Sequence, residues 1–256
     1  MIVAAFRVRS FRFQMPADLL TSWAFEMETL ILGWYVMVNT GSVLLLTAFA
    51  SLQQLGTLAA PMFGVLGDRL GGRGMLCAMR ATFAILAALL MALALTGMLT
   101  PAWVFAVAVL AGIVRPNDQV MRNALIGETI PPAHLVGALG VSRATMDSAR
   151  VAGALVGAGL STVLGIGPSY IFVTSFYVAS LALTFGVSRR PPYAAFADRA
   201  SAGMPRPSRW RDLRDGLVHV LRTPELLAMM WLAFLINLTA YPASSGLLPY
   251  VAKRVY

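Results

Sequence analysis

The sequence predicts an all-α polytopic membrane protein, in which a six-helix transmembrane bundle is followed by a seventh transmembrane helix. Of the 256 residues, 58% are hydrophobic and only 12% are charged, whereas about a quarter of the residues of a soluble domain are charged. Mean hydropathy is +0.73. Seven apolar stretches, each near the length of about 20 residues that crosses a bilayer as a helix, follow one another with short breaks.

Each expected span is an apolar run bounded by helix-breaking residues. The breaks read N-T-G-S at 39–42, G-G at 71–72, T-P at 100–101, P-P at 131–132, G-I-G-P at 165–168 and P-P at 191–192. Gly and Pro in such clusters favour turns over helix. The spans are therefore expected at 14–38, 43–66, 75–99, 101–124, 142–166, 168–187 and 226–251. They form an N-terminal six-helix bundle (1–188), a linker with an amphipathic helix (189–225), and a seventh span that starts a truncated C-terminal half (226–256).

The distribution of arginine orients the chain. Arginines lie in the N-terminal arm, in the joints after the second and fourth spans, and in the linker, whereas segments 39–42, 97–101 and 165–169 contain no Lys or Arg. Under the positive-inside rule the N-terminus and the linker are expected to be cytoplasmic, in a bacterial cell inner membrane. Three acids, Asp18, Glu26 and Glu28, interrupt the first apolar run, so it is expected to be an uncleaved span and not a signal peptide.

Composition also narrows the function. The net charge of +9 is explained by membrane topology, so no nucleic-acid partner is expected. Cys77 is the single cysteine, and His134 and His219 have no ligand-spaced partners. No Gly-rich phosphate loop and no Ser-His-Asp arrangement is present. We therefore expect no enzyme activity, no metal and no cofactor; the expected partners are the lipid bilayer, a small-molecule substrate and protons.

The first span carries a polar stripe. Charged residues inside spans are costly and mark candidate functional sites. At 100° per residue, one arc of about 80° contains Asp18, Ser22, Glu26, Thr29 and Gly33. Asp18 and Glu26 are the candidate substrate or proton site, on a face directed at an aqueous cavity; the alternative is that these acids pair with arginines of neighbouring helices and hold the bundle together. Glu28 lies on nearly the opposite side.

Two charge ladders lie at one cytoplasmic level. They consist of Arg115, Asp118 and Arg122 in the fourth span, and Arg143, Asp147 and Arg150 in the fifth. Spacings of three and four residues place each set on one helix face, so an ion network between the two helices is expected. Support of a gate and plain packing both remain open as its role. Gly153 and Gly157 have the small-xxx-small spacing that allows close helix packing.

Residues 64–73 read G-V-L-G-D-R-L-G-G-R at the cytoplasmic joint of the second and third spans. This segment resembles the G-x-x-x-D-R-x-G-R-R/K loop of the major facilitator superfamily, and Gly72 stands where that family usually has arginine. The matching residues are Gly64, Asp68, Arg69, Gly71 and Arg73. The resemblance implies a cytoplasmic gate, with glycines in a tight turn and ion pairs made by Asp68 and the arginines.

Two further segments resemble the siderophore and multidrug exporter branch of that superfamily. They are Gly33-Trp34 with N-T-G-S at 39–42, and G-A-L-V-G at 153–157, where Ala154 replaces the proline of the branch's G-P-x-x-G. Arg115 is similar to the arginine of the family's fourth helix. The resemblance implies a major-facilitator-type bundle that exports a small amphipathic molecule by alternating access, coupled to protons.

The resemblance covers the first seven of twelve expected helices. A fragment or a truncated gene is the favoured explanation, so that a missing C-terminal half is an expected partner; two copies assembling together is the other. An uptake carrier for a small organic solute, and a non-transporting membrane remnant or scaffold, stay open as alternative functions.

Overall fold

The computed structural model describes residues 6–57, 63, 67, 70–187, 222–225, 227–229, 231, 232 and 235. The chain divides into two compact units, Met1–Arg199 and Ala200–Tyr256, and every helix named below belongs to the first. In the second unit the described residues from 224 to 235 are helical. Most of the linker and most of the expected seventh span lie outside the described residues.

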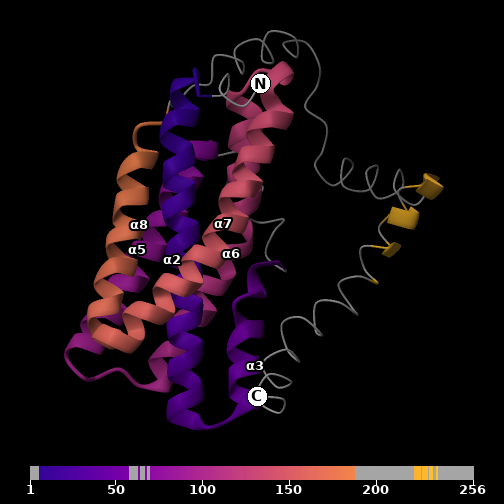
Figure 1. Ribbon diagram of the computed structural model, residues 1–256. Coiled ribbons are helices and arrows are strands. Elements are labelled where there is room, and N and C mark those ends of the chain that lie inside the picture. The colour runs from indigo at the N-terminus through magenta and orange to yellow at the C-terminus, as the bar shows by residue number, and fades with distance from the viewer. Residues whose placement is uncertain are drawn as a thin grey trace. The chain divides into compact units, whose positions relative to one another are not determined.

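The first unit is a bundle of long helices that run side by side (Figure 1). No strand occurs among the residues that the structure describes. The helices are α2 (Arg9–Thr40), α3 (Val43–Leu52), the 3-10 turn η1 (Leu55–Thr57), α5 (Gly72–Leu95), α6 (Pro101–Thr129), α7 (Pro132–Leu164) and α8 (Ile166–Thr184). The helical class predicted from composition is confirmed.

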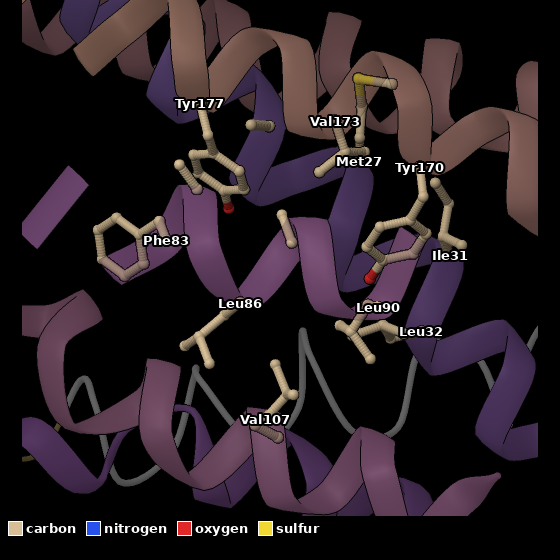
Figure 2. Close-up of a cluster of buried hydrophobic side chains, with 14 of the residues drawn as sticks. Met27, Ile31, Leu32, Phe83, Leu86, Leu90, Val107, Tyr170, Val173 and Tyr177 are labelled. Carbon is tan, nitrogen blue, oxygen red and sulfur yellow. The ribbon is translucent and has the colours of Figure 1, made fainter. Parts of the chain in front are cut away.

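Helix α2 is the central element of the bundle. It contacts α3, α6, α7 and α8, while α5 packs against α6 and α8. Their apolar side chains form two buried clusters, and part of the larger one is shown in Figure 2. Because α2 contacts four other helices, its polar residues face several different partners. These partners make up the site described below.

Residues with special backbone geometry end the helices where the sequence predicts breaks. Helix α2 ends at Gly41, whose φ of 62° is left-handed and therefore suits a residue without a Cβ. Ser42 caps α3 by accepting a hydrogen bond from the backbone N–H of Leu45. Pro101 and Pro132 occupy the first turns of α6 and α7, where the missing N–H has no cost.

Helices α6 and α7 extend beyond the expected spans. Helix α6 continues from 124 to Thr129, and α7 begins at Pro132 in place of 142. Both helices run up to the two prolines at 131 and 132 and pass through Gly127, Gly137 and Gly140 without interruption. Hydropathy marks the part of a helix that lies in lipid, whereas breakers mark where the helix ends.

The second span is less regular than expected. A continuous helix over 43–66 was predicted, but the described part ends at Leu52 and continues as the short 3-10 turn η1. Asn117 of α6 donates a hydrogen bond of 2.9 Å to the carbonyl oxygen of Gly56. The interruption therefore lies where this segment packs closely against α6.

Three of the described helices are long and apolar enough to cross a membrane: α5, α6 and α8. Helices α2 and α7 are longer still, with 32 and 33 residues, but they are not among the three. The polytopic character is thus confirmed for the described part of the chain, while a total of seven spans is not.

A methyl group on Gly112 is expected to weaken the bundle strongly. The added Cβ would lie 2.0 Å from the carbonyl oxygen of Leu52 and 2.9 Å from the Cα of Gln53, so backbone would have to move. Overpacking of this kind costs about 1–3 kcal/mol or more. Gly112→Ala should therefore unfold at lower temperature in detergent than the wild type. Gly159→Ala is the control, because its Cβ meets no atom within 4 Å; equal midpoints for the two variants would contradict this packing.

Candidate functional site

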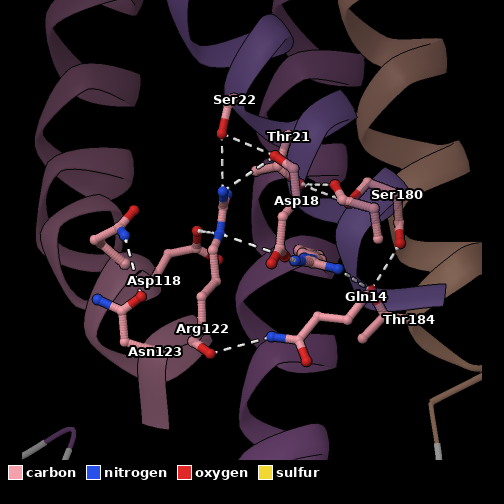
Figure 3. Close-up of polar contacts among 12 residues, drawn as sticks. Gln14, Asp18, Thr21, Ser22, Asp118, Arg122, Asn123, Ser180 and Thr184 are labelled. Atoms are coloured by element: carbon pink, nitrogen blue, oxygen red, sulfur yellow. Dashed lines mark hydrogen bonds and ion pairs between the residues drawn. The ribbon is translucent and has the colours of Figure 1, made fainter. Parts of the chain in front are cut away.

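A buried cluster of charged side chains joins α2, α5 and α6 near the N-terminal end of α2 (Figure 3). Arg80 of α5 donates a hydrogen bond to the Asp18 carboxylate and another to the hydroxyl of Thr184 on α8. The Nε of Arg122 on α6 lies 3.7 Å from Asp18 Oδ1 and 2.5 Å from Asp118 Oδ2. The four charged residues are at most 4% exposed.

Neutral groups complete the surroundings of Arg122. Its Nη1 donates to the carbonyl oxygen of Asp18 at 3.1 Å and to the hydroxyl of Ser22 at 2.8 Å. The amide of Gln14 in turn donates to the carbonyl oxygen of Arg122 at 3.1 Å. Gln14, Asp18 and Ser22 all belong to α2. Hydrogen bonds to the side chain and to the backbone of Arg122 therefore join α6 to α2.

The cluster contains two carboxylates and two guanidiniums, so its formal charges balance. Buried ions are tolerated when they are paired and hydrogen-bonded, and this is the environment of Asp18. The Asp18 carboxylate thus meets arginines of two neighbouring helices, which is the geometry that the pairing alternative expects.

A second polar group lies at the middle of α6. Arg115 donates one hydrogen bond to the side-chain oxygen of Gln53 and one of 2.7 Å to the carbonyl oxygen of Phe25. Its guanidinium carbon lies 4.4 Å from the centroid of the Phe25 ring, within the range of a cation–π interaction. Thr29 donates to the same Gln53 oxygen at 3.3 Å. Arg115 thus contacts α2 and the turn after α3 and does not contact Asp118.

Glu28 occupies a third environment, in the core between α2 and α8. The hydroxyl of Tyr177 donates to Glu28 Oε2 at 2.8 Å. Figure 2 shows Tyr170 and Tyr177 extending from the same side of α8 into the apolar core. Glu28 is 8% exposed, and no Lys, Arg or His side chain of the described residues lies within 4 Å of its carboxylate.

The remaining ion pairs are close to the surface of the bundle. Glu26 of α2 lies 3.9 Å from Arg150 of α7, and Arg143 lies 3.3 Å from Asp147 within α7. The expected network between the two charge ladders is not formed by the described residues, because each ladder pairs internally or with α2. Helix α2 supplies an acid to each ladder: Asp18 lies beside Arg122 of α6, and Glu26 lies beside Arg150 of α7.

No three His, Cys, Asp or Glu side chains among the described residues lie close enough together to hold a metal ion. The three polar groups described above are centred on Asp18, Arg115 and Glu28. These groups can form ion pairs, bind a charged group or carry a proton.

Comparison with known protein families matches residues 17–256 to the Major Facilitator Superfamily. The chain belongs to this superfamily. It is accordingly a multi-pass membrane protein from a family that transports small solutes, and this family is one of transporters and not of enzymes. No curated protein matched the sequence.

The loop that resembles the superfamily's gate motif is partly described. Gly64, Asp68 and Arg69 lie outside the described residues. Gly71 has a φ of 74° directly before α5, a conformation that favours glycine. Arg73 donates a hydrogen bond of 2.6 Å to the carbonyl oxygen of Phe185 at the end of α8. The motif therefore fastens the start of α5 to the end of α8.

Two glycines of α7 lie against α2. A Cβ on Gly153 would be 3.0 Å from the Cβ of Glu26, and one on Gly157 would be 2.9 Å from the Cα of Met27. Larger residues at these positions would separate the two helices.

Sequence reasoning missed Arg80 and Glu28 as site residues. Arg80, which lies just inside the third expected span, was not singled out there, and Glu28 was set aside because it lies opposite the polar stripe. Both are charged residues inside an apolar helix, and that signal alone is sufficient to find them.

Proposed function

We propose that this chain moves a small amphipathic molecule across the bacterial inner membrane by alternating access, as an exporter coupled to protons and related to the siderophore and multidrug branch. In this proposal the N-terminus and the linker are cytoplasmic. The proposal is supported by the gate motif and by the absence of Lys and Arg from segments 39–42, 97–101 and 165–169.

The observation that carries the proton coupling is the environment of Glu28. Asp18, Glu28 and Asp118 are the buried acids among the described residues, and of these Glu28 alone has no arginine within 4 Å. A buried carboxylate without an ion pair is costly when charged, which favours binding of a proton. The charge of Arg115, which acts on Glu28 from beyond 4 Å, favours its release. Glu28 therefore replaces Asp18 as the proposed proton carrier, and Glu26 remains the competing candidate.

The gate is proposed at the cytoplasmic end of the bundle. Asp68, Arg69 and Arg73 would form it, and the hydrogen bond from Arg73 to α8 supports a role for this loop in joining helix ends. Asp147 and Arg150 would support the gate through the polar side of α7.

Dye efflux from energised cells that express the 256-residue chain tests the proposal. Efflux should exceed that of control cells, should stop when an uncoupler collapses the proton gradient, and should be lost in Asp68→Asn. Absence of proton-dependent efflux from a well-expressed, membrane-inserted chain would contradict it.

An uptake carrier for a small organic solute is the second candidate. The pairing of Asp18 with Arg80 and of Glu26 with Arg150 favours it, because both acids of the polar stripe are neutralised and an exported cation would find little free negative charge there. Uptake into right-side-out vesicles, measured beside efflux, distinguishes the two directions.

A further inference from the structure

The arginines inside the bundle differ in how their charge is balanced. Arg80 and Arg122 each have a carboxylate within 4 Å, and so has Arg150 at the surface of the bundle. Arg115 has none among the described residues, and its hydrogen bonds go to two neutral oxygens, those of the Gln53 side chain and the Phe25 backbone. No ion pair within 4 Å therefore neutralises its positive charge in the part of the chain that the structure describes, and the Glu28 carboxylate acts on it only from a longer distance.

The position of Arg115 along α6 shows that its charge lies inside the bilayer. Arg115 is fourteen residues from either end of α6, or about 21 Å along the helix axis at 1.5 Å per residue. The expected span of this helix is 101–124, and Arg115 lies nine residues, or about 14 Å, from its cytoplasmic end, so it belongs to the part of α6 inside the bilayer. Lipid phosphates lie at the surfaces of the bilayer, and they are too far away to balance the charge at this depth.

The guanidinium also has donors to spare. It carries five N–H groups in a planar fork, and the two hydrogen bonds to Gln53 and Phe25 use two of them. Arg115 is only partly buried, and none of its nitrogens is among the buried polar atoms without a partner. The fork geometry of the remaining donors suits the two oxygens of a carboxylate, sulfonate or phosphate.

The surroundings hold the side chain in place for such a ligand. Thr29 and Arg115 both donate to the side-chain oxygen of Gln53, and the ring of Phe25 lies against the guanidinium. Polar groups and an aromatic face are thus side by side, as the recognition of a molecule with one charged end and one apolar end requires.

We infer that Arg115, positioned by Gln53 and Phe25, binds an anionic group of the transported solute, so that the substrate class is amphipathic organic anions. This inference rests on the transport function proposed above and holds for either direction of transport. Arg115 accordingly acts within the bilayer as a binding residue and not as a support of the cytoplasmic gate.

Thermal unfolding of the purified 256-residue chain in detergent tests the inference. The probes are benzoate, octanoate and octyl sulfate, and each is compared with an uncharged alcohol and an ammonium ion of similar size. At least one anion should raise the unfolding midpoint of the wild type more than its neutral and cationic analogues do. Arg115→Gln should lower the affinity for that anion by roughly 10- to 100-fold, the range for losing a charge-assisted hydrogen bond.

Matched variants separate binding from folding. Arg115→Lys keeps the charge and should retain part of the affinity. Arg12→Gln removes an exposed arginine from the start of α2 and should leave the affinity unchanged. The inference is overturned if no anion outperforms its neutral analogue, or if Arg115→Gln binds the anion as tightly as the wild type.

The experiments distinguish failure of the anion-binding inference from failure of the proposed transport function. If a cationic or neutral dye is exported in a proton-dependent manner while no anion binds, this inference fails and the proposed function stands. If an anion binds through Arg115 and no solute is transported, the anion site stands and the proposed function fails.

Discussion

Asp18→Ala is expected to lower the free energy of unfolding of the bundle by about 3–5 kcal/mol, the range for removing one partner of a buried ion pair. Arg80 is fully buried and would keep only the hydroxyl of Thr184 as a hydrogen-bond acceptor. Arg122 would still be paired with Asp118. The loss therefore arises mainly from the buried charge of Arg80, and reversible unfolding in mixed micelles measures it.

Asp147→Ala is the matched control for that measurement. Its partner Arg143 lies 3.3 Å away, but the two side chains are 53% and 67% exposed, and exposed pairs contribute about 0–1 kcal/mol. Asp18→Ala combined with Arg80→Met should recover part of the lost stability, because no charge is then left unpaired at Arg80. Similar effects for Asp18→Ala and Asp147→Ala would contradict the buried position of the cluster.

Glu28→Gln should abolish proton-driven transport while leaving the chain folded. The glutamine oxygen can still accept the hydrogen bond from Tyr177, which is 2.8 Å long in the structure. An amide, however, cannot take up and release a proton near neutral pH. Transport under a pH gradient should therefore fall to the rate that the wild type shows after an uncoupler is added. Downhill movement of the solute should persist.

Glu26→Gln is the matched control for Glu28→Gln, since it makes the same chemical change on the same helix. Glu26 is partly exposed and lies beside Arg150, so this variant should keep its dependence on the gradient. If Glu26→Gln loses coupling and Glu28→Gln keeps it, the proton site belongs to Glu26. Glu28→Leu, by contrast, leaves the buried Tyr177 hydroxyl without its acceptor and should cost about 1–3 kcal/mol of stability.

The ends of the helices show how far local sequence information extends. The breaks at 39–42 and at the prolines of 131–132 were predicted correctly, because backbone geometry at Gly and Pro is a local property. The extent of α6 and α7 was underestimated over residues 125–141, where both helices continue up to the proline pair. The interruption after Leu52 was missed, since it depends on how closely α6 approaches.

The polar stripe of α2 illustrates the limit of periodicity. Spacing placed Asp18 and Glu26 on one face, yet Asp18 is 4% exposed and meets two arginines, whereas the side chain of Glu26 is 31% exposed and lies beside one. Periodicity describes the angle of a side chain around its own helix, and the identity of its neighbour depends on which helix packs there.

Composition, apolar runs and breakers were thus sufficient to identify an α-helical membrane protein, and the loop at 64–73 was sufficient to suggest the superfamily that the family match later showed. These features are local, since each depends on residues close together in the chain. The pairing of charges is not local. Asp18 is 62 residues from Arg80 and 104 from Arg122, so only the packing of α2 against α5 and α6 decides that these charges neutralise one another. The same packing leaves Glu28 and Arg115 without ion-pair partners among the described residues, because burial and proximity depend on the whole bundle and not on any single helix.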